Sequence, residues 1–233
     1  MDTKFIQLKG LSKSYGQTLA IDNISIDIMK GKIVGLLGPN GCGKTTLLKL
    51  LANLLSNYTG EILIDGHKPG IETKKTISYL PDRNYLTDSW TAIKAVEFFE
   101  DFYSDFNSEK ALKLISKLDI PLDRKFKSMS KGTKEKLQLI LVLSRKAELY
   151  LFDEPIAGVD PAARDAIFDL ILENYNREAT ILITTHLVHD VERILDYAIF
   201  LNNGQITRYG EVSNLIGNTG KTLEDLFKED FRK

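Results

Sequence analysis

Short apolar runs, each ending in polar or glycine residues, recur along the chain. They are KIVGLLG at 32–38, LYLFDE at 149–154 and TILITTH at 180–186. Runs without a polar face are typical of strands that are buried on both faces of a parallel sheet. Helical patterns separate them, and one follows Asp160-Pro161, a helix cap with proline at the first helical position. This alternation predicts an α/β fold with a mostly parallel central sheet.

Two other regions have different patterns. Residues 4–16 and 20–32 alternate apolar and polar side chains, which predicts an N-terminal antiparallel β flap and hence a mixed sheet. No parallel strand is evident between about 87 and 146, where Ala111, Leu114, Ile115 and Leu118 keep helical spacing. We therefore expect an inserted helical subdomain within one domain of residues 1–233, with a short helical tail over about 210–233.

Charge and cysteine content limit the function classes. The 31 basic and 32 acidic residues give a net charge of −1, so no global field favours nucleic acid or an anionic membrane surface. The single cysteine, Cys42, excludes an internal disulfide framework and fits a reducing cytosol. The first ten residues hold no apolar signal core, and no apolar run approaches the roughly 20 residues that span a bilayer. We expect a soluble chain.

A phosphate-binding loop is the most specific motif. After the first apolar run the sequence reads GPNGCGKTT and continues into the apolar helix pattern LLKLLANLL, which matches G-x-x-x-x-G-K-[ST] in a strand–loop–helix setting. In such a loop the glycines let backbone N–H groups approach phosphate oxygens, the lysine meets the β and γ phosphates, and the hydroxyl that follows it binds Mg²⁺. The cysteine is interpreted as a small loop residue and not as a redox group. The predicted ATP site is formed by Gly38, Pro39, Asn40, Gly41, Cys42, Gly43, Lys44, Thr45 and Thr46.

The other two apolar runs end in candidate catalytic residues. Asp153 would hold Mg²⁺ through water, and Glu154 would orient or deprotonate the attacking water. Adjacent acids are more often a solvated loop start, but the buried strand before them disfavours that alternative. His186 could reach a γ-phosphate from the same sheet edge, where open α/β sheets bind ligands. The isolated His67 and His189 are interpreted as structural.

With these motifs in this order, the sequence resembles the ATP-binding cassette family, the nucleotide-binding subunits of ABC transporters. The resemblance extends from Phe5 to about Tyr209. It implies that Tyr15 stacks on adenine, although a surface hairpin tyrosine is the alternative. It also implies that residues 156–160, ending at Asp160, form the D-loop beside the nucleotide, and that His186 is the switch histidine.

Two departures from the family pattern matter. Asp82 stands where the family usually has a glutamine that senses Mg²⁺ and water, and it could still bind the metal through water. The L-S-G-G-Q signature is replaced by MSKGT at 129–133, which keeps Ser130 and Gly132. A helix cap formed by Ser130 is the alternative interpretation of this stretch. The variants resemble a branch of bacterial exporter ATPases.

The resemblance also implies an assembly. In the family the signature faces the phosphate loop of a second cassette, so Ser130 and Gly132 would act in trans on ATP held by an identical or paralogous partner. Hydrolysis of ATP with Mg²⁺ would drive a separately encoded membrane permease, an exporter, and would place the chain on the cytoplasmic face of the membrane. The permease would dock near residues 82–90, where Tyr85 and Trp90 are exposed or else pack within the subdomain.

Three observations weigh against other functions. A soluble cassette ATPase that acts on DNA would carry a long coiled-coil insertion, and one that acts on ribosomes would carry two cassettes, whereas this sequence has neither. A small-molecule kinase with a phosphate loop would not explain Ser130, Asp160 and His186 together. No nucleic-acid partner is expected.

Overall fold

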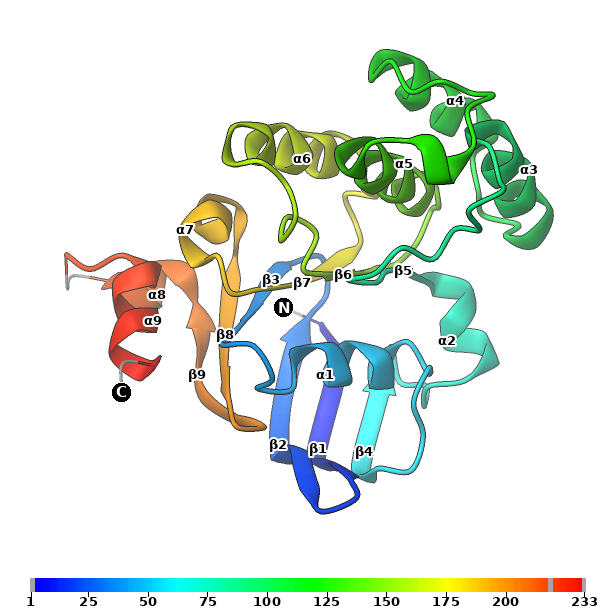
Figure 1. Ribbon diagram of the computed structural model, residues 1–233. Coiled ribbons are helices and arrows are strands. Elements are labelled where there is room, and N and C mark those ends of the chain that lie inside the picture. The colour runs from blue at the N-terminus through cyan, green and yellow to red at the C-terminus, as the bar shows by residue number, and fades with distance from the viewer. Residues whose placement is uncertain (1–2, 218–219, 232–233) are drawn as a thin grey trace.

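The computed structural model describes residues 3–217 and 220–231, arranged around two β-sheets (Figure 1). Residues 1–2, 218–219 and 232–233, which the domain and tail predictions also include, lie outside the described residues. The larger sheet has the strand order β5-β6-β7-β3-β8-β9, and the smaller has the order β2-β1-β4. The strands are β1 Lys4–Tyr15, β2 Thr18–Met29, β3 Ile33–Leu37, β4 Thr59–Ile64, β5 Ile77–Leu80, β6 Leu149–Asp153, β7 Thr180–Thr185, β8 Tyr197–Asn202 and β9 Gln205–Glu211.

Helices cover both faces of the larger sheet. In Figure 1, α1 lies between the two sheets, while α5 and α6 lie on the opposite face of the larger one. The helices are α1 Lys44–Leu51, α2 Ile71–Thr76, α3 Ala92–Phe102, α4 Ser108–Lys117, α5 Lys131–Leu143, α6 Pro161–Asn174, α7 Val188–Val191, α8 Val212–Ile216 and α9 Leu223–Phe231. None of the helices in the described residues combines the length and the apolar character that a membrane span requires.

Alternation along the central strands divides the apolar core into two layers. Val34 and Leu36 of β3 belong to the core that contains α1 and the smaller sheet. Leu37 of the same strand belongs to the core that contains α5 and α6. Because successive side chains of a strand point to opposite faces, a strand covered on both sides must be apolar throughout. This explains the unbroken apolar runs of β3, β6 and β7.

The N-terminal strands do not join the central sheet. β1 pairs antiparallel with both β2 and β4, which gives the predicted antiparallel flap a third strand and a sheet of its own. The expectation that these strands would create one mixed sheet is therefore wrong. Their alternating pattern provides a single apolar face, and that face packs against α1. The central sheet is mixed for another reason, since β9 pairs antiparallel with β8.

In-register parallel pairing brings the carboxyl ends of four strands to one edge of the sheet. Leu37 of β3 lies beside Thr185 of β7, and Asp153 of β6 lies beside Thr184. β5 continues the edge, since its last residue, Leu80, lies beside Phe152. The segments that follow these strands are the phosphate loop, residues 81–84, residues 154–160 and His186. The topology therefore places all of them along one edge.

Three helices, α3, α4 and α5, occupy most of the segment between β5 and β6. Each begins at a side-chain cap, where Thr91, Asn107 and Ser130 accept a hydrogen bond from the backbone N–H three residues later. Ala111, Leu114 and Ile115 are buried on one face of α4, as their spacing predicts. After the central sheet ends at Glu211, α8 and α9 form the remaining described structure.

Arg145 joins this helical segment to the central sheet. Its buried guanidinium donates hydrogen bonds to the backbone oxygens of Ile77 (2.6 Å) and Lys75 (2.7 Å) and to Asp105 Oδ1 (3.0 Å). It also lies 3.9 Å from the ring centroid of Tyr103. Only a planar guanidinium group, which carries several N–H donors, can donate hydrogen bonds to all of these acceptors at once. Arg145 therefore fixes the end of α5 against the edge strand β5.

We expect Arg145→Ala to lower the free energy of unfolding by about 3 kcal/mol, because it leaves buried acceptors without a donor. Arg145→Lys should recover only part of this loss, since one ammonium cannot replace the fork. Urea denaturation measures the free energy of unfolding of both variants. The control is Lys113→Ala on the exposed face of α4, expected to change the value by less than about 0.5 kcal/mol. A loss below about 1 kcal/mol for Arg145→Ala would contradict the role given to Arg145.

Candidate functional site

The loop between β3 and α1 is shaped by glycines that leave no space for a side chain. A Cβ atom at Gly38 would collide with the backbone oxygen of Leu201, and one at Gly43 with that of Ala20. Gly43 also has φ 113°, in the region that favours glycine. The Leu47 N–H donates to the Gly43 carbonyl (3.0 Å), so the N–H groups of residues 44–46 precede the first helical hydrogen bond and can face an anion.

Lys44, the first residue of α1, folds its side chain back over the loop. Its ammonium donates to the carbonyl oxygens of Gly38 (2.8 Å) and Pro39 (3.2 Å), and it lies 3.3 Å from Glu154 Oε1. The side chain is almost fully buried. A buried cation requires an anion nearby, and here Glu154 supplies it.

Asp153 is a fully buried carboxylate that accepts three hydroxyl hydrogen bonds. Thr45 of α1 (3.0 Å) and Thr184 of β7 (2.8 Å) donate to Oδ1, and Tyr79 of β5 (3.3 Å) donates to Oδ2. Burial raises the pKa of Asp153, and the hydrogen bonds from Thr184 and Thr45 offset part of that rise. The side chains of Thr184 and Tyr79 thus belong to the site, although the sequence analysis did not identify them.

Glu154 has an unusual backbone conformation that is held in place by β7. Its φ is 51°, which a residue with a side chain seldom adopts. Its N–H points to Thr184, with the carbonyl oxygen at 3.1 Å and Oγ1 at 2.9 Å. Its carboxylate lies between two predicted site residues, since Oε2 is 3.1 Å from His186 Nδ1 and Oε1 faces Lys44. The structure therefore brings Lys44, Glu154 and His186 together.

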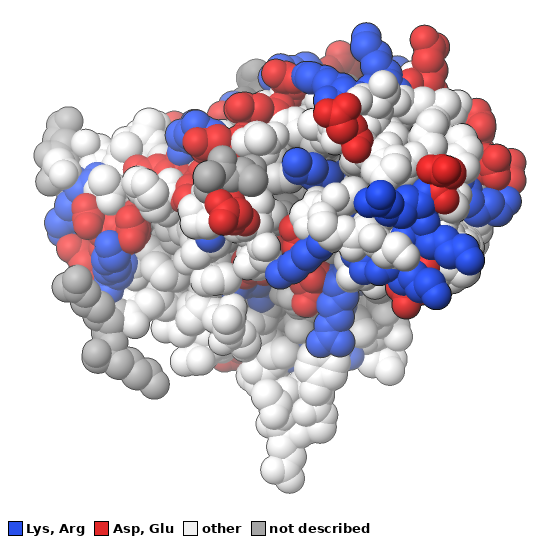
Figure 2. All heavy atoms as spheres, turned by 45° about the horizontal axis from the view of Figure 1, so that its top comes forward, with Lys and Arg blue, Asp and Glu red and all other residues white. Residues whose placement is uncertain are grey.

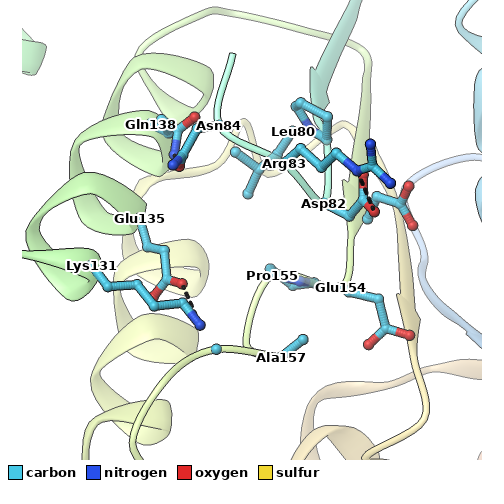
Figure 3. Close-up of a pocket in the computed structure, with 13 residues that line it drawn as sticks. Leu80, Asp82, Arg83, Asn84, Lys131, Glu135, Gln138, Glu154, Pro155 and Ala157 are labelled. Atoms are coloured by element: carbon cyan, nitrogen blue, oxygen red, sulfur yellow. Dashed lines mark hydrogen bonds and ion pairs between the residues drawn. The ribbon is translucent and has the colours of Figure 1, made fainter. Parts of the chain in front are cut away.

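A cavity of about 460 Å³ opens beside Glu154 (Figure 3). Its walls come from three segments: residues 80–84 after β5, the first turns of α5, and residues 153–158. Asp82 lies on this wall, partly exposed, 4.0 Å from Arg83. Asp82 and Asp153 both line this cavity, and the negative charge of Asp82 contributes to the raised pKa of Asp153, after the larger effect of burial.

The predicted metal ligands form a set that fits Mg²⁺. This ion prefers hard oxygen donors, and here the Thr45 hydroxyl and the Asp153 carboxylate meet directly, with Asp82 close by. A bound cation would also favour the charged form of Asp153, which burial disfavours.

Other predicted site residues lie outside this centre. Tyr15 ends β1 with 47% of its surface exposed, and the Lys13 ammonium lies 5.3 Å from its ring centroid. Its hairpin approaches the phosphate loop, because Ala20 of β2 contacts Gly43. Asp160 directly precedes α6.

Ser130 caps α5. Its Oγ accepts from the Thr133 N–H (3.2 Å) and lies 2.7 Å from Thr133 Oγ1. Gly132 is exposed in the first turn, with open space where a side chain would be. The hydrogen bonds of Ser130 in the described part of the chain stay on its own helix.

The two aromatic residues near the predicted docking region pack within the helical segment. Tyr85 donates its hydroxyl to the Gln138 carbonyl (3.1 Å), and its N–H bonds to the Gln138 side chain (2.9 Å). Trp90 lies 4.7 Å from Phe98, measured between ring centroids. Tyr85 nevertheless keeps 36% of its surface exposed.

Comparison with known proteins identifies the family. The model of the family described as "ABC transporter" matches residues 21–157. The chain is 33% identical over 213 residues to the ABC transporter ATP-binding protein YtrB of Bacillus subtilis, covering 90% of this chain and 73% of that protein. It is 27% identical over 222 residues to the Nod factor export ATP-binding protein I of Cupriavidus metallidurans, covering 92% and 73%.

A solved structure agrees over almost the whole length. The ATP-binding subunit of an ABC transporter superposes with a TM-score of 0.85 at 27% identity, covering 97% of this chain and 98% of that one. The chain therefore belongs to the ABC transporter family, as one of its ATP-binding, ATP-hydrolysing subunits.

Proposed function

We propose that this subunit drives an exporter permease from the cytoplasmic face of the membrane, with Glu154 as the general base of ATP hydrolysis. One observation carries the assignment of the base: the Glu154 carboxylate is held between Lys44 and His186, at the sheet edge where the phosphate loop begins. The name of the Cupriavidus relative, a Nod factor export ATP-binding protein, supports export as the direction of transport.

The contacts of Lys44 suggest how ATP binding prepares the base. In the present arrangement the ammonium binds loop carbonyls and Glu154. Triphosphate in the loop would offer Lys44 a stronger anion, because charge-assisted bonds to phosphate outweigh those to carbonyls. Glu154 would then be free to accept a proton from water, while His186 orients it and meets the γ-phosphate.

The predicted metal ligands would support this step. When bound, Mg²⁺ would neutralise charge that develops on the phosphate oxygens. Thr45, Asp153 and Asp82 would hold it, directly or through water, and the hydroxyls of Thr184 and Tyr79 would keep Asp153 oriented. Tyr15 would stack on the adenine, which its exposed ring at the end of β1 permits.

A second cassette would complete the site. Ser130 and Gly132 stand at the start of α5, where free N–H groups and the helix dipole favour an anion. The open space at Gly132 supports the approach of a phosphate held by another subunit. Asp160, in the D-loop, would lie at the same interface.

The permease would dock on the helical segment. Phe98 and Phe102 of α3 are stacked (5.8 Å) and remain 41% and 67% exposed, next to Trp90. The adjoining stretch 123–127 carries three basic residues and one acidic residue, in a chain whose net charge is −1. Figure 2 shows a group of basic side chains, with acidic ones among them, on the side of the molecule where the helical segment lies. An aromatic and basic surface of this kind fits a cytoplasmic segment that presents apolar and acidic side chains.

We expect Lys44→Ala to weaken MgATP binding by roughly 10²-fold, because the phosphates lose a charge-assisted contact. Calorimetric titration measures the affinity. Lys49→Ala removes the same charge from the last turn of the same helix and should bind ATP normally. Unchanged affinity in Lys44→Ala would show that the loop is not the phosphate site.

Glu154→Gln keeps the size of the side chain but removes the base. We expect ATP binding to persist, turnover to fall by roughly 10²–10⁴-fold, and an ATP-bound dimer to accumulate. Steady-state hydrolysis and size-exclusion chromatography with ATP measure these effects. If Glu154→Gln turns over like the wild type while Asp82→Asn does not, the base is Asp82.

Ser130→Arg distinguishes a helix cap from a trans site. We expect this variant to bind ATP nearly normally but not to hydrolyse it, since its own phosphate loop is intact. A cap alone would cost about 1 kcal/mol of stability and leave activity unchanged. Ser128→Arg, two residues earlier on an exposed turn, controls for added bulk and charge.

Mixed subunits provide the complementary measurement. If two copies of the chain form the dimer, inactive Ser130→Arg mixed with inactive Lys44→Ala gives dimers with one intact site, so partial recovery demonstrates action in trans. A folded Ser130→Arg protein with full activity in the assembled transporter would reduce Ser130 to a helix cap.

A further inference from the structure

One contact at the cavity beside Glu154 joins α5 to the segment after β6 and involves neither the phosphate loop nor the proposed metal ligands. The Lys131 side chain, from the first residue of α5, lies across Gly158 in the D-loop, residues 156–160. In Figure 3, Lys131 and Glu135 approach from α5 toward the segment that carries Glu154, Pro155 and Ala157. Lys131 stands where the family's L-S-G-G-Q signature has its first glycine, so this side chain is one that the usual signature lacks.

Gly158 is needed for close approach and not for its backbone conformation. Its φ does not fall in the left-handed region. A Cβ atom there would collide with Nζ and Cε of Lys131 and would lie 2.6 Å from Glu135 Oε1. Because the end of a lysine is flexible, a methyl group at position 158 would displace the Lys131 ammonium without forcing the backbone to move.

Glu135 explains why the Lys131 side chain rests there. The Glu135 carboxylate is only 23% exposed, and its Oε1 lies 3.9 Å from Lys131 Nζ. In the described structure its Oε2 has no hydrogen-bond partner. Burial raises the pKa of Glu135, whereas the charge of Lys131 lowers it. The two side chains thus form one unit that covers Gly158.

The covered segment leads directly to the backbone of Glu154. The Ala157 N–H donates to the Glu154 carbonyl (3.2 Å), and the Val159 N–H to that of Ile156 (3.1 Å). Glu154 itself has φ 51°, a conformation that persists only where the surroundings enforce it. Thr184 holds it from β7, while the turn of residues 156–159 holds it from the other side.

We propose that Lys131 is a positioning residue: together with Glu135 it holds the D-loop at Gly158 against α5 and thereby fixes the orientation of the Glu154 carboxylate. The inference rests on the proposed role of Glu154 as the base. Lys131 is 73% exposed, so its ion pair contributes little to the stability of the fold. Its effect falls on catalysis, where small displacements of a reacting group are costly.

Four variants test this through the ATPase activity of the purified protein. We expect Lys131→Ala to lower kcat roughly 10-fold, a tenth of the 10²-fold loss that a 1 Å displacement can cause. KM for ATP and the melting temperature should stay near the wild-type values, because neither the phosphate loop nor the core is touched. Gly158→Ala should give the same loss from the opposite side of the contact. The double variant should lose no more than either single one, since both break one contact. Lys131→Arg, which keeps the charge and the reach, should restore most of kcat.

Lys136→Ala is the matched control, because it removes a lysine from the same helix away from the D-loop and should leave kcat unchanged. A normal kcat in Lys131→Ala overturns the proposal. So does a loss in Lys131→Ala without one in Gly158→Ala, since Lys131 would then act directly on a phosphate. Normal turnover in Glu154→Gln instead overturns the role of the base, so the two failures are distinguishable.

Discussion

The carboxylate of Asp153 is the constraint on which the site depends. It is fully buried at the end of β6, where an ionised group without partners would be strongly unfavourable. Hydroxyl groups from β5, β7 and α1 donate hydrogen bonds to it, so three elements that are distant in sequence are bonded to one carboxylate. The same hydroxyl of Thr184 also bonds the Glu154 N–H. A polar requirement in the core thus helps to set the position of Glu154, the neighbouring residue that we propose as the base.

Sequence reasoning found the elements that carry continuous local signals. The phosphate loop is readable because glycines, lysine and threonine occupy fixed positions between a strand and a helix, and β3, β6 and β7 match their apolar runs to within a residue. Thr184 and Tyr79 were missed, since their roles depend on β6 lying between β5 and β7, a strand order that no local pattern encodes. Their signal was weak: a hydroxyl inside an otherwise apolar strand must find an acceptor.

That the N-terminal strands form a sheet of their own also could not be predicted from a local pattern. Alternation correctly indicates one buried face in β1 and β2, but it does not say what covers that face. α1 fills this place, with Leu47, Leu48 and Leu51 between the two sheets. The helix that starts at the phosphate loop therefore also packs against the apolar face of the N-terminal sheet. The β1–β2 hairpin, which carries Tyr15, is held close to this loop where Ala20 approaches Gly43.

Capping and trans recognition by Ser130 do not exclude each other. As a cap, Ser130 accepts the hydrogen bond of the Thr133 N–H. The cap thereby holds the first turn of α5 in one conformation, which fixes the orientation of the exposed backbone at Gly132. A phosphate held by a second subunit would bind more tightly to a turn whose backbone is already oriented, because ordering the turn on binding would cost affinity. Lys131, between these two residues, turns its side chain away toward Gly158 and leaves the backbone of the turn accessible. The departures from the usual signature thus leave the backbone at Gly132 exposed while adding a contact between Lys131 and Gly158.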